Sequence, residues 1–166
     1  MIDLKVLMVE KEDCDAGTVQ QLRNGLITDK AQYKVLRDAA DTLKKRLATV
    51  SGPAAGKIHL KLGISLYFLG HPKEAVDHLG QADGALAAFY HGRIQASREK
   101  YPEALAAFEK AEKAGYNASQ VNLQRAGVQR QLGKFKEANE LLEKHKDLAS
   151  HSAEFHFQLG QLRLQE

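Results

Sequence analysis

Apolar residues recur every three or four positions along most of this chain, which is the spacing that places side chains on one face of an α-helix. In residues 28–50 this stripe consists of Tyr33, Leu36, Ala40, Leu43 and Leu47. A shorter stripe of Val19, Leu22 and Leu26 precedes it. No alternation of strand and helix patterns follows. The pattern predicts an all-α protein.

The first 50 residues read as a helical hairpin. We expect residues 1–50 to form an N-terminal capping region or a degenerate repeat, joined to the remainder by the sequence SGPAAG at 51–56. The apolar stretch at 2–10 fits either a short strand or the start of a helix.

Residues 51–166 contain an internal repeat. Segments 58–82, 86–111 and 122–145 align, and each predicts two helices separated by a turn. A small residue recurs in the first helix at Gly63, Gly92, Ala126 and Gly160, at intervals of 29, 34 and 34 residues. A second marker, at Ala75, Ala104 and Ala138, keeps the intervals of 29 and 34. Two independent markers with one period indicate repeated units.

The small residues predict how each pair of helices packs. We expect the glycine or alanine of the first helix to face the alanine of the second, so that the two backbones approach closely. A large side chain, Phe108 or Leu79, then fills the space beside them. Neither helix buries its apolar stripe alone, so the units have to stack.

These markers resemble those of the tetratricopeptide repeat (TPR) family. The resemblance is carried by Leu62, Gly63, Gly70, Ala75, Leu79 and Ala82, by Tyr101, Ala104, Phe108 and Ala111, and by Gly133, Phe135, Ala138 and Leu142. The first-helix tryptophan of the family is replaced by His59, Ala88 and Asn122, and the terminal proline is missing. The resemblance implies an α-α superhelix, a right-handed solenoid of antiparallel helix pairs. It also implies about three repeats in 51–166, followed by a lone terminal helix.

In the resembled family the first helices line a concave groove that binds a peptide or helix of another protein. Carried over to this chain, the groove residues are Tyr67, Phe68, Phe89, Tyr90, Arg93, Gln124 and Arg130. The residues with which one branch of the family grips a terminal carboxylate are replaced here by Leu60, Ile64, Tyr90, Gln120 and Gln124, so we reject that clamp. Tyrosine, phenylalanine and arginine commonly anchor interfaces. The expected function is therefore a non-enzymatic scaffold that binds an apolar or aromatic segment. The alternative for Phe68, Phe89 and the neighbouring aliphatic residues is core packing between first helices.

The C-terminal helix suggests a second interpretation. Its apolar residues cannot all face one neighbour. Either this helix caps the array with an apolar side exposed, or the native chain continues past residue 166, which is the explanation we favour. The alternative is a homodimer or larger oligomer that forms through Phe155, Phe157, Leu162 and Leu164.

Composition excludes several other classes of protein. Basic and acidic residues number 24 and 21, giving a net charge of +3 without a basic tail, so we expect no nucleic-acid partner. No apolar stretch approaches the roughly 18 residues of a membrane span. The lone Cys14 and the lack of a signal-peptide pattern favour the cytoplasm. The seven histidines form no metal-binding motif and no phosphate loop is present, so we expect no catalysis, metal or cofactor.

Overall fold

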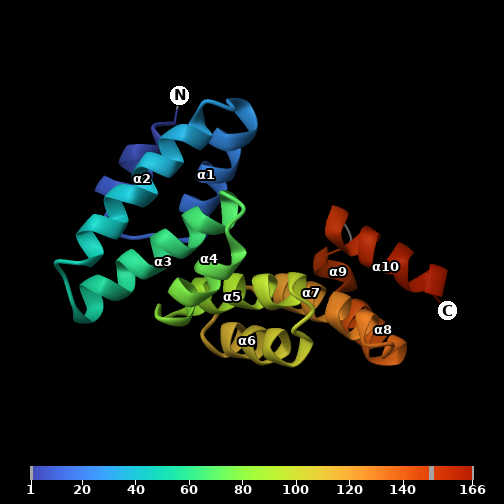
Figure 1. Ribbon diagram of the computed structural model, residues 1–166. Coiled ribbons are helices and arrows are strands. Elements are labelled where there is room, and N and C mark those ends of the chain that lie inside the picture. Colours follow the sequence, from blue (N-terminus) through green and yellow to red (C-terminus); the bar gives the residue numbers. More distant parts are fainter. Residues whose placement is uncertain (1, 150–151, 166) are drawn as a thin grey trace. The chain divides into compact units, whose positions relative to one another are not determined.

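The computed structural model describes residues 2–149 and 152–165, and within these ranges all regular secondary structure is helical (Figure 1). The elements are η1 (Val6–Glu10), α1 (Ala16–Thr28), α2 (Gln32–Leu47), α3 (Gly52–Phe68), α4 (Pro72–Gly80), α5 (Ala85–Ser97), α6 (Tyr101–Lys113), α7 (Ala118–Gln131), α8 (Phe135–Lys144), α9 (Lys146–Ala149) and α10 (Ala153–Gln165). The predicted all-α fold of paired helices is confirmed.

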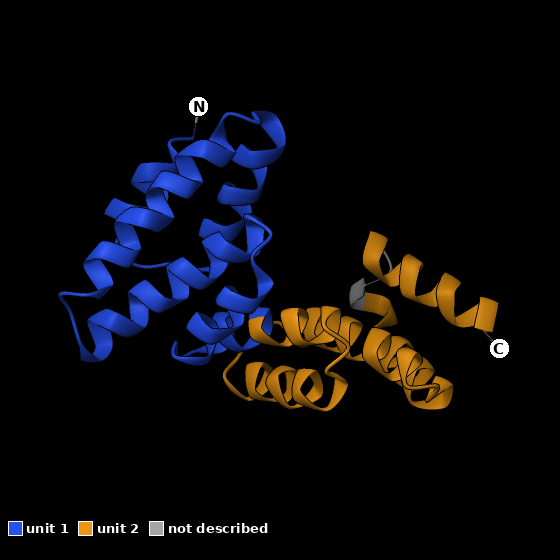
Figure 2. Cartoon of the chain, in the orientation of Figure 1, with its two compact units in different colours: residues 1–90 blue, residues 91–166 orange. Residues whose placement is uncertain are grey.

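The chain divides into two compact units (Figure 2), which we describe separately. Unit 1 comprises residues 1–90 and unit 2 comprises residues 91–166, so the division falls within α5. This division into compact units differs from the one expected from the sequence, in which the repeats begin after residue 50. The start of the repeats at that point stays a prediction.

The N-terminal segment of unit 1 is helical rather than extended. Leu4 and Met8 are completely buried, and the side chain of Leu4 lies over Gly25 of α1, where an added Cβ would meet Leu4 Cδ2 at 3.1 Å. Arg46 at the end of α2 donates a hydrogen bond from Nη1 to the carbonyl oxygen of Val9 at 2.7 Å. The apolar stretch at 2–10 is therefore part of the core of unit 1.

A capping residue marks the start of α1, and an apolar stripe marks the buried face of α2. Asp15 caps α1, because its carboxylate accepts a hydrogen bond from the backbone N–H of Thr18 at 2.7 Å. On α2 the predicted stripe is buried at Leu36 and Leu43, whereas Tyr33 at its beginning is exposed. The residue ranges of α1 and α2 include the apolar positions from which the sequence predicted a helical hairpin.

Helices α3 and α4 form the first repeat. Gly63 is the point of closest approach, since an added Cβ there would lie 2.6 Å from Cγ of Leu79 and 3.3 Å from the carbonyl oxygen of Ala75. Residues 51–56 are not a joint, which corrects our expectation. Gly52 already begins α3, and a proline in the first turn is compatible with this start because its missing N–H is not needed there.

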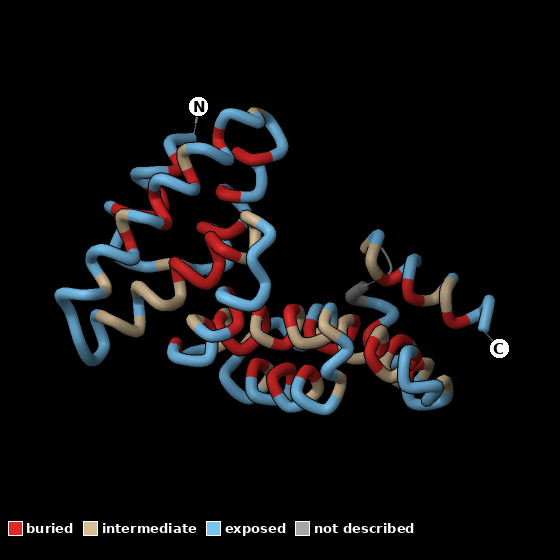
Figure 3. Tube along the Cα trace, in the orientation of Figure 1, coloured by how far each residue is buried: buried red, intermediate tan, exposed pale blue. Residues whose placement is uncertain are grey.

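Unit 2 repeats the same packing in α5 and α6. An added Cβ at Gly92 would lie 2.7 Å from two carbons of the Phe108 ring. Phe108 and Ala104 are both completely buried. In the next pair, Ala126 of α7 and Ala138 of α8 share a core with Leu142. Figure 3 shows buried positions alternating with exposed ones along these helices, as expected for amphipathic helices.

Helix α10 is attached to the core of unit 2 by one of its faces. Phe155 and Leu162 are 3% and 1% exposed and join the core formed by α7 and α8. The alternative that places these two residues on an exposed dimer surface is therefore wrong. Phe157 and Leu164 are exposed. An added Cβ at Gly160 would have no atom of the described residues within 4 Å, so none of the described helices approaches it closely.

Candidate functional site

The structure brings the four predicted aromatic residues of unit 1 together. Tyr67 contacts Phe68 and Tyr90 with ring centroids 5.1 and 5.3 Å apart, and Phe89 contacts Tyr90 at 5.5 Å. Phe89 and Tyr90 are buried, whereas Tyr67 and Phe68 are half-buried. The cluster therefore presents parts of two rings to solvent and holds the other two beneath them.

The predicted polar residues belong to unit 2. Arg93 lies on α5 and is half-buried. Gln124 and Arg130 lie on α7 and line a surface cleft of about 340 Å³. The cleft is lined by Ala96, Ser97, Glu99, Tyr101, Gln124, Gly127, Val128, Arg130, Gln131 and Gln158. We call it the unit 2 cleft.

Helical spacing explains why α7 contributes half of the lining residues. Gln124, Gly127 and Gln131 are separated by three and four residues, so they share one face of the helix. Ala126 lies on another face and packs in the core with α8. Amphipathic spacing of α7 therefore leaves a polar face toward the cleft.

A glutamine from α10 closes one side of the cleft. Gln158 is only 7% exposed and lies directly against Gly127, because an added Cβ at that glycine would be 2.8 Å from Gln158 Nε2. Its Nε2 donates a hydrogen bond to Oε1 of Glu154 at 2.7 Å. Its Oε1 is buried and has no hydrogen-bond partner within the described ranges.

Arg130 provides the complementary unsatisfied group. It is 9% exposed, and its Nη1 donates to Oε1 of Gln165 at 3.2 Å. Its Nε–H is buried and has no acceptor among the described residues. A buried polar group without a partner costs about 1–3 kcal/mol relative to a satisfied one. Both unpartnered atoms belong to residues that line the cleft, but the atoms themselves are buried.

Sequence reasoning missed Gln158, although the repeat contained the signal. The interval of 34 residues that relates Ala126 to Gly160 also relates Gln124 to Gln158. Applying the period to the groove positions as well as to the small residues would have placed Gln158 in the same face as Gln124.

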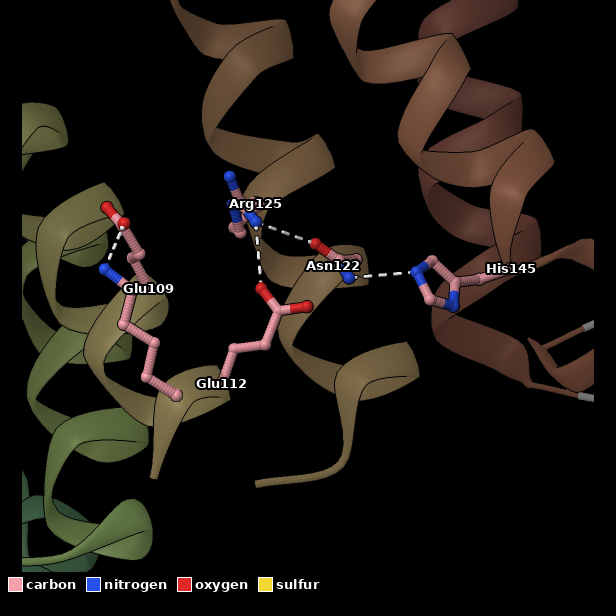
Figure 4. A network of polar contacts seen from close by, with 6 residues as sticks. Glu109, Glu112, Asn122, Arg125 and His145 are labelled. Atoms are coloured by element: carbon pink, nitrogen blue, oxygen red, sulfur yellow. Dashed lines mark hydrogen bonds and ion pairs between the residues drawn. The ribbon is translucent and has the colours of Figure 1, made fainter. Parts of the chain in front are cut away.

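A second polar network in unit 2 connects neighbouring helices (Figure 4), with Asn122 and His145 buried and the side chains of Arg125 and Glu112 partly exposed. Arg125 donates from Nη1 to Glu112 Oε2 at 3.2 Å and to Asn122 Oδ1 at 3.1 Å. Asn122 in turn lies 2.9 Å from Nε2 of His145. Burial, together with the nearby charge of Lys144, lowers the pKa of His145. Asn122, which replaces the family's first-helix tryptophan, therefore connects α6, α7 and the end of α8.

The chain contains a cysteine and a pair of adjacent histidines that could in principle take part in catalysis or metal binding. Burial raises the pKa of the Cys14 thiol to about 11, so this cysteine is protonated and weakly nucleophilic at neutral pH. The rings of His59 and His78 meet with their Nδ1 atoms 2.9 Å apart. Among the described residues, no group of three or more histidine, cysteine or acidic side chains is arranged to hold a metal ion. Within the same ranges no helix is long and apolar enough to span a bilayer.

Comparison with known proteins bears on the fold. The chain resembles the crystal structure of a tetratricopeptide repeat protein from Parabacteroides merdae, with a TM-score of 0.70 and 14% sequence identity. The match covers 89% of this chain and 59% of that protein, so this chain spans about three fifths of its length. No protein-family model matches the sequence, and no curated protein matches it. The resemblance to TPR proteins is confirmed at the level of the fold.

Proposed function

We propose that this protein is a non-enzymatic scaffold that binds a segment of another protein in the unit 2 cleft. The observation that carries the proposal is the surface cleft itself, which is lined mainly by polar side chains. A peptide offers backbone carbonyl and N–H groups, and these can hydrogen-bond to polar side chains of this kind.

The aromatic cluster of unit 1 is a second candidate contact. Tyr67 and Phe68 offer partly exposed rings that would accept an apolar or aromatic side chain of the partner. Phe89 and Tyr90 support this surface by fixing the positions of the exposed rings. Arg93 and Gln124 remain further candidate contacts in unit 2.

A selection of displayed random peptides on the immobilised full chain tests the proposal. The affinity of a selected peptide is then compared between the unmodified protein and Gln158→Leu, which removes the amide with little change in volume. We expect a loss of about tenfold, as for one hydrogen-bonded group. Gln161→Leu is the matched control, because it changes the same residue type on α10 outside the cleft lining. Equal affinity for the protein and Gln158→Leu would refute binding in the cleft.

Self-association is the second candidate function, and a specific surface favours it. Phe157 and Leu164 are 54% and 82% exposed and lie seven residues apart on one face of α10. A stable dimer buries about 800 Å² on each partner, so these side chains need additional surface around them. Light scattering over a range of concentrations tests this candidate. A mass that stays monomeric for the full chain, and is unchanged in Phe157→Glu, would exclude it.

A further inference from the structure

Glu99 has a backbone conformation that a glycine would adopt more easily. Its φ is +60°, and it is the only non-glycine residue with positive φ among the described residues. The equivalent turns of the other repeats contain Gly70 at φ +80° and Gly133 at φ +74°. A Cβ strains this left-handed conformation, which is why glycine is the usual residue there.

The three turns share the same hydrogen bond as well as the same φ. The residue after each positive-φ position donates its N–H to a carbonyl five residues earlier, at 2.9 Å in every case. The donor and acceptor pairs are His71 with Leu66, Lys100 with Gln95, and Lys134 with Gln129. This is the helix C-cap that glycine normally makes. The turn itself therefore gives no reason for a glutamate, and the reason has to come from its side chain.

Glu99 is also one of the residues that line the unit 2 cleft. Among the described residues the lining has one other charged side chain, that of Arg130, which is buried and bonded through Nη1 to Gln165. Glu99 is exposed. An anionic ligand would meet the Glu99 carboxylate unfavourably, whereas a cationic side chain would be attracted to it.

We propose that the unit 2 cleft selects a peptide segment containing a lysine or arginine, and that Glu99 is the residue that determines this specificity. The proposal rests on the proposed function and extends it. The segment lies along the polar lining of the cleft, and its cationic side chain pairs with the carboxylate of Glu99. The glutamate retains a strained turn because it contributes to binding.

Peptide pools of defined charge test this specificity. Four pools of short random peptides, acetylated and amidated to remove terminal charges, contain no charged residue except at one fixed position, which is lysine, arginine, glutamate or glutamine. Their retention is measured on the immobilised full chain, on Glu99→Gln and on Glu99→Gly. Glu140→Gln is the matched control, since Glu140 is an exposed glutamate of unit 2 outside the cleft lining.

We expect the unmodified protein to retain the lysine and arginine pools about two- to fivefold more strongly than the glutamine pool, as for one exposed ion pair. Both Glu99 variants lose this preference and still retain the glutamine pool, while Glu140→Gln keeps the preference. Glu99→Gly also unfolds at a midpoint about 2–4 °C higher, because the strain is relieved.

The outcomes separate the two proposals. If the unmodified protein retains no pool, the proposed function itself fails. If it retains the pools without a preference for basic residues, prefers the glutamate pool, or keeps the basic preference in Glu99→Gln, the role of Glu99 is refuted and peptide binding stands. An unchanged or lower midpoint for Glu99→Gly would remove the argument from backbone strain.

Discussion

Adding one methyl group to a glycine gives opposite results at two equivalent positions of the repeat, and this is the most direct test of the packing. Gly92 of α5 and Gly160 of α10 occupy the same place in their repeats. An added Cβ at Gly92 would lie 2.7 Å from Cδ1 and Cε1 of Phe108, which is completely buried. At Gly160 the same atom would meet nothing within 4 Å.

The magnitudes follow from two opposing effects. Alanine is favoured over glycine inside a helix by about 0.8–1.0 kcal/mol, and this gain applies to both positions. At Gly92 the ring of Phe108 has to shift within a packed core, and overpacking costs about 1–3 kcal/mol. We therefore expect Gly160→Ala to raise the free energy of unfolding by up to about 1 kcal/mol. We expect Gly92→Ala to fall about 1–3 kcal/mol below it.

Urea denaturation followed by circular dichroism measures both values, with the slope checked for equality between variants. A variant with a smaller side chain at position 108 tests whether the Phe108 ring causes the effect. In a Phe108→Leu background the cost of Gly92→Ala should decrease, because the ring carbons that it meets are gone. If Gly92→Ala stabilises the protein as much as Gly160→Ala does, the close packing of α5 and α6 at this point is refuted.

Three further predictions concern other parts of the structure. Burial lowers the pKa of His59 and of His78, so the folded state binds fewer protons than the unfolded state, and the free energy of unfolding should decrease as the pH falls below about 6.5. Denaturation at a series of pH values should show a smaller decrease for His78→Gln, and an unchanged slope would contradict the pairing. Asn122→Leu should lower the free energy of unfolding by about 1–3 kcal/mol in urea titrations, because it leaves buried partners unsatisfied, and a neutral effect would argue against the network. Phe155→Ala should cost about 3–5 kcal/mol in the same assay and Phe157→Ala less than about 0.5, whereas equal costs would contradict the placement of α10.

Much of the fold could be predicted because the signals are local and repeated. Gly63 and Gly92 follow the period of the repeat, and both lie where a second helix approaches closely. Gly70 and Gly133 mark turns through their positive φ, which depends on the residue type itself. The residue type of Glu99 carries no such signal, but the intervals of 29 and 34 residues that separate it from Gly70 and Gly133 place it at the same turn of the repeat.

The candidate site was predictable only in part. Gln124 and Arg130 follow from the position of the groove in the repeat, but the role of Arg130 depends on Gln158, which lies 28 residues further along the chain. The burial of Phe89 and Tyr90, and the burial of one face of α10, likewise depend on contacts between helices. The periodicity of apolar residues identifies an apolar face of a helix, but it does not show whether another helix packs against that face.

Helix positions, turn positions and the close contact within each repeat are properties that the amino-acid order fixed, because side-chain spacing and glycine content act within a few residues. The tertiary structure decided which polar atoms are buried without a partner and which face of α10 is covered. These features arise from desolvation and packing between segments that are distant in the chain. Their energies depend on which atoms surround a group in three dimensions, and this information is absent from any local pattern.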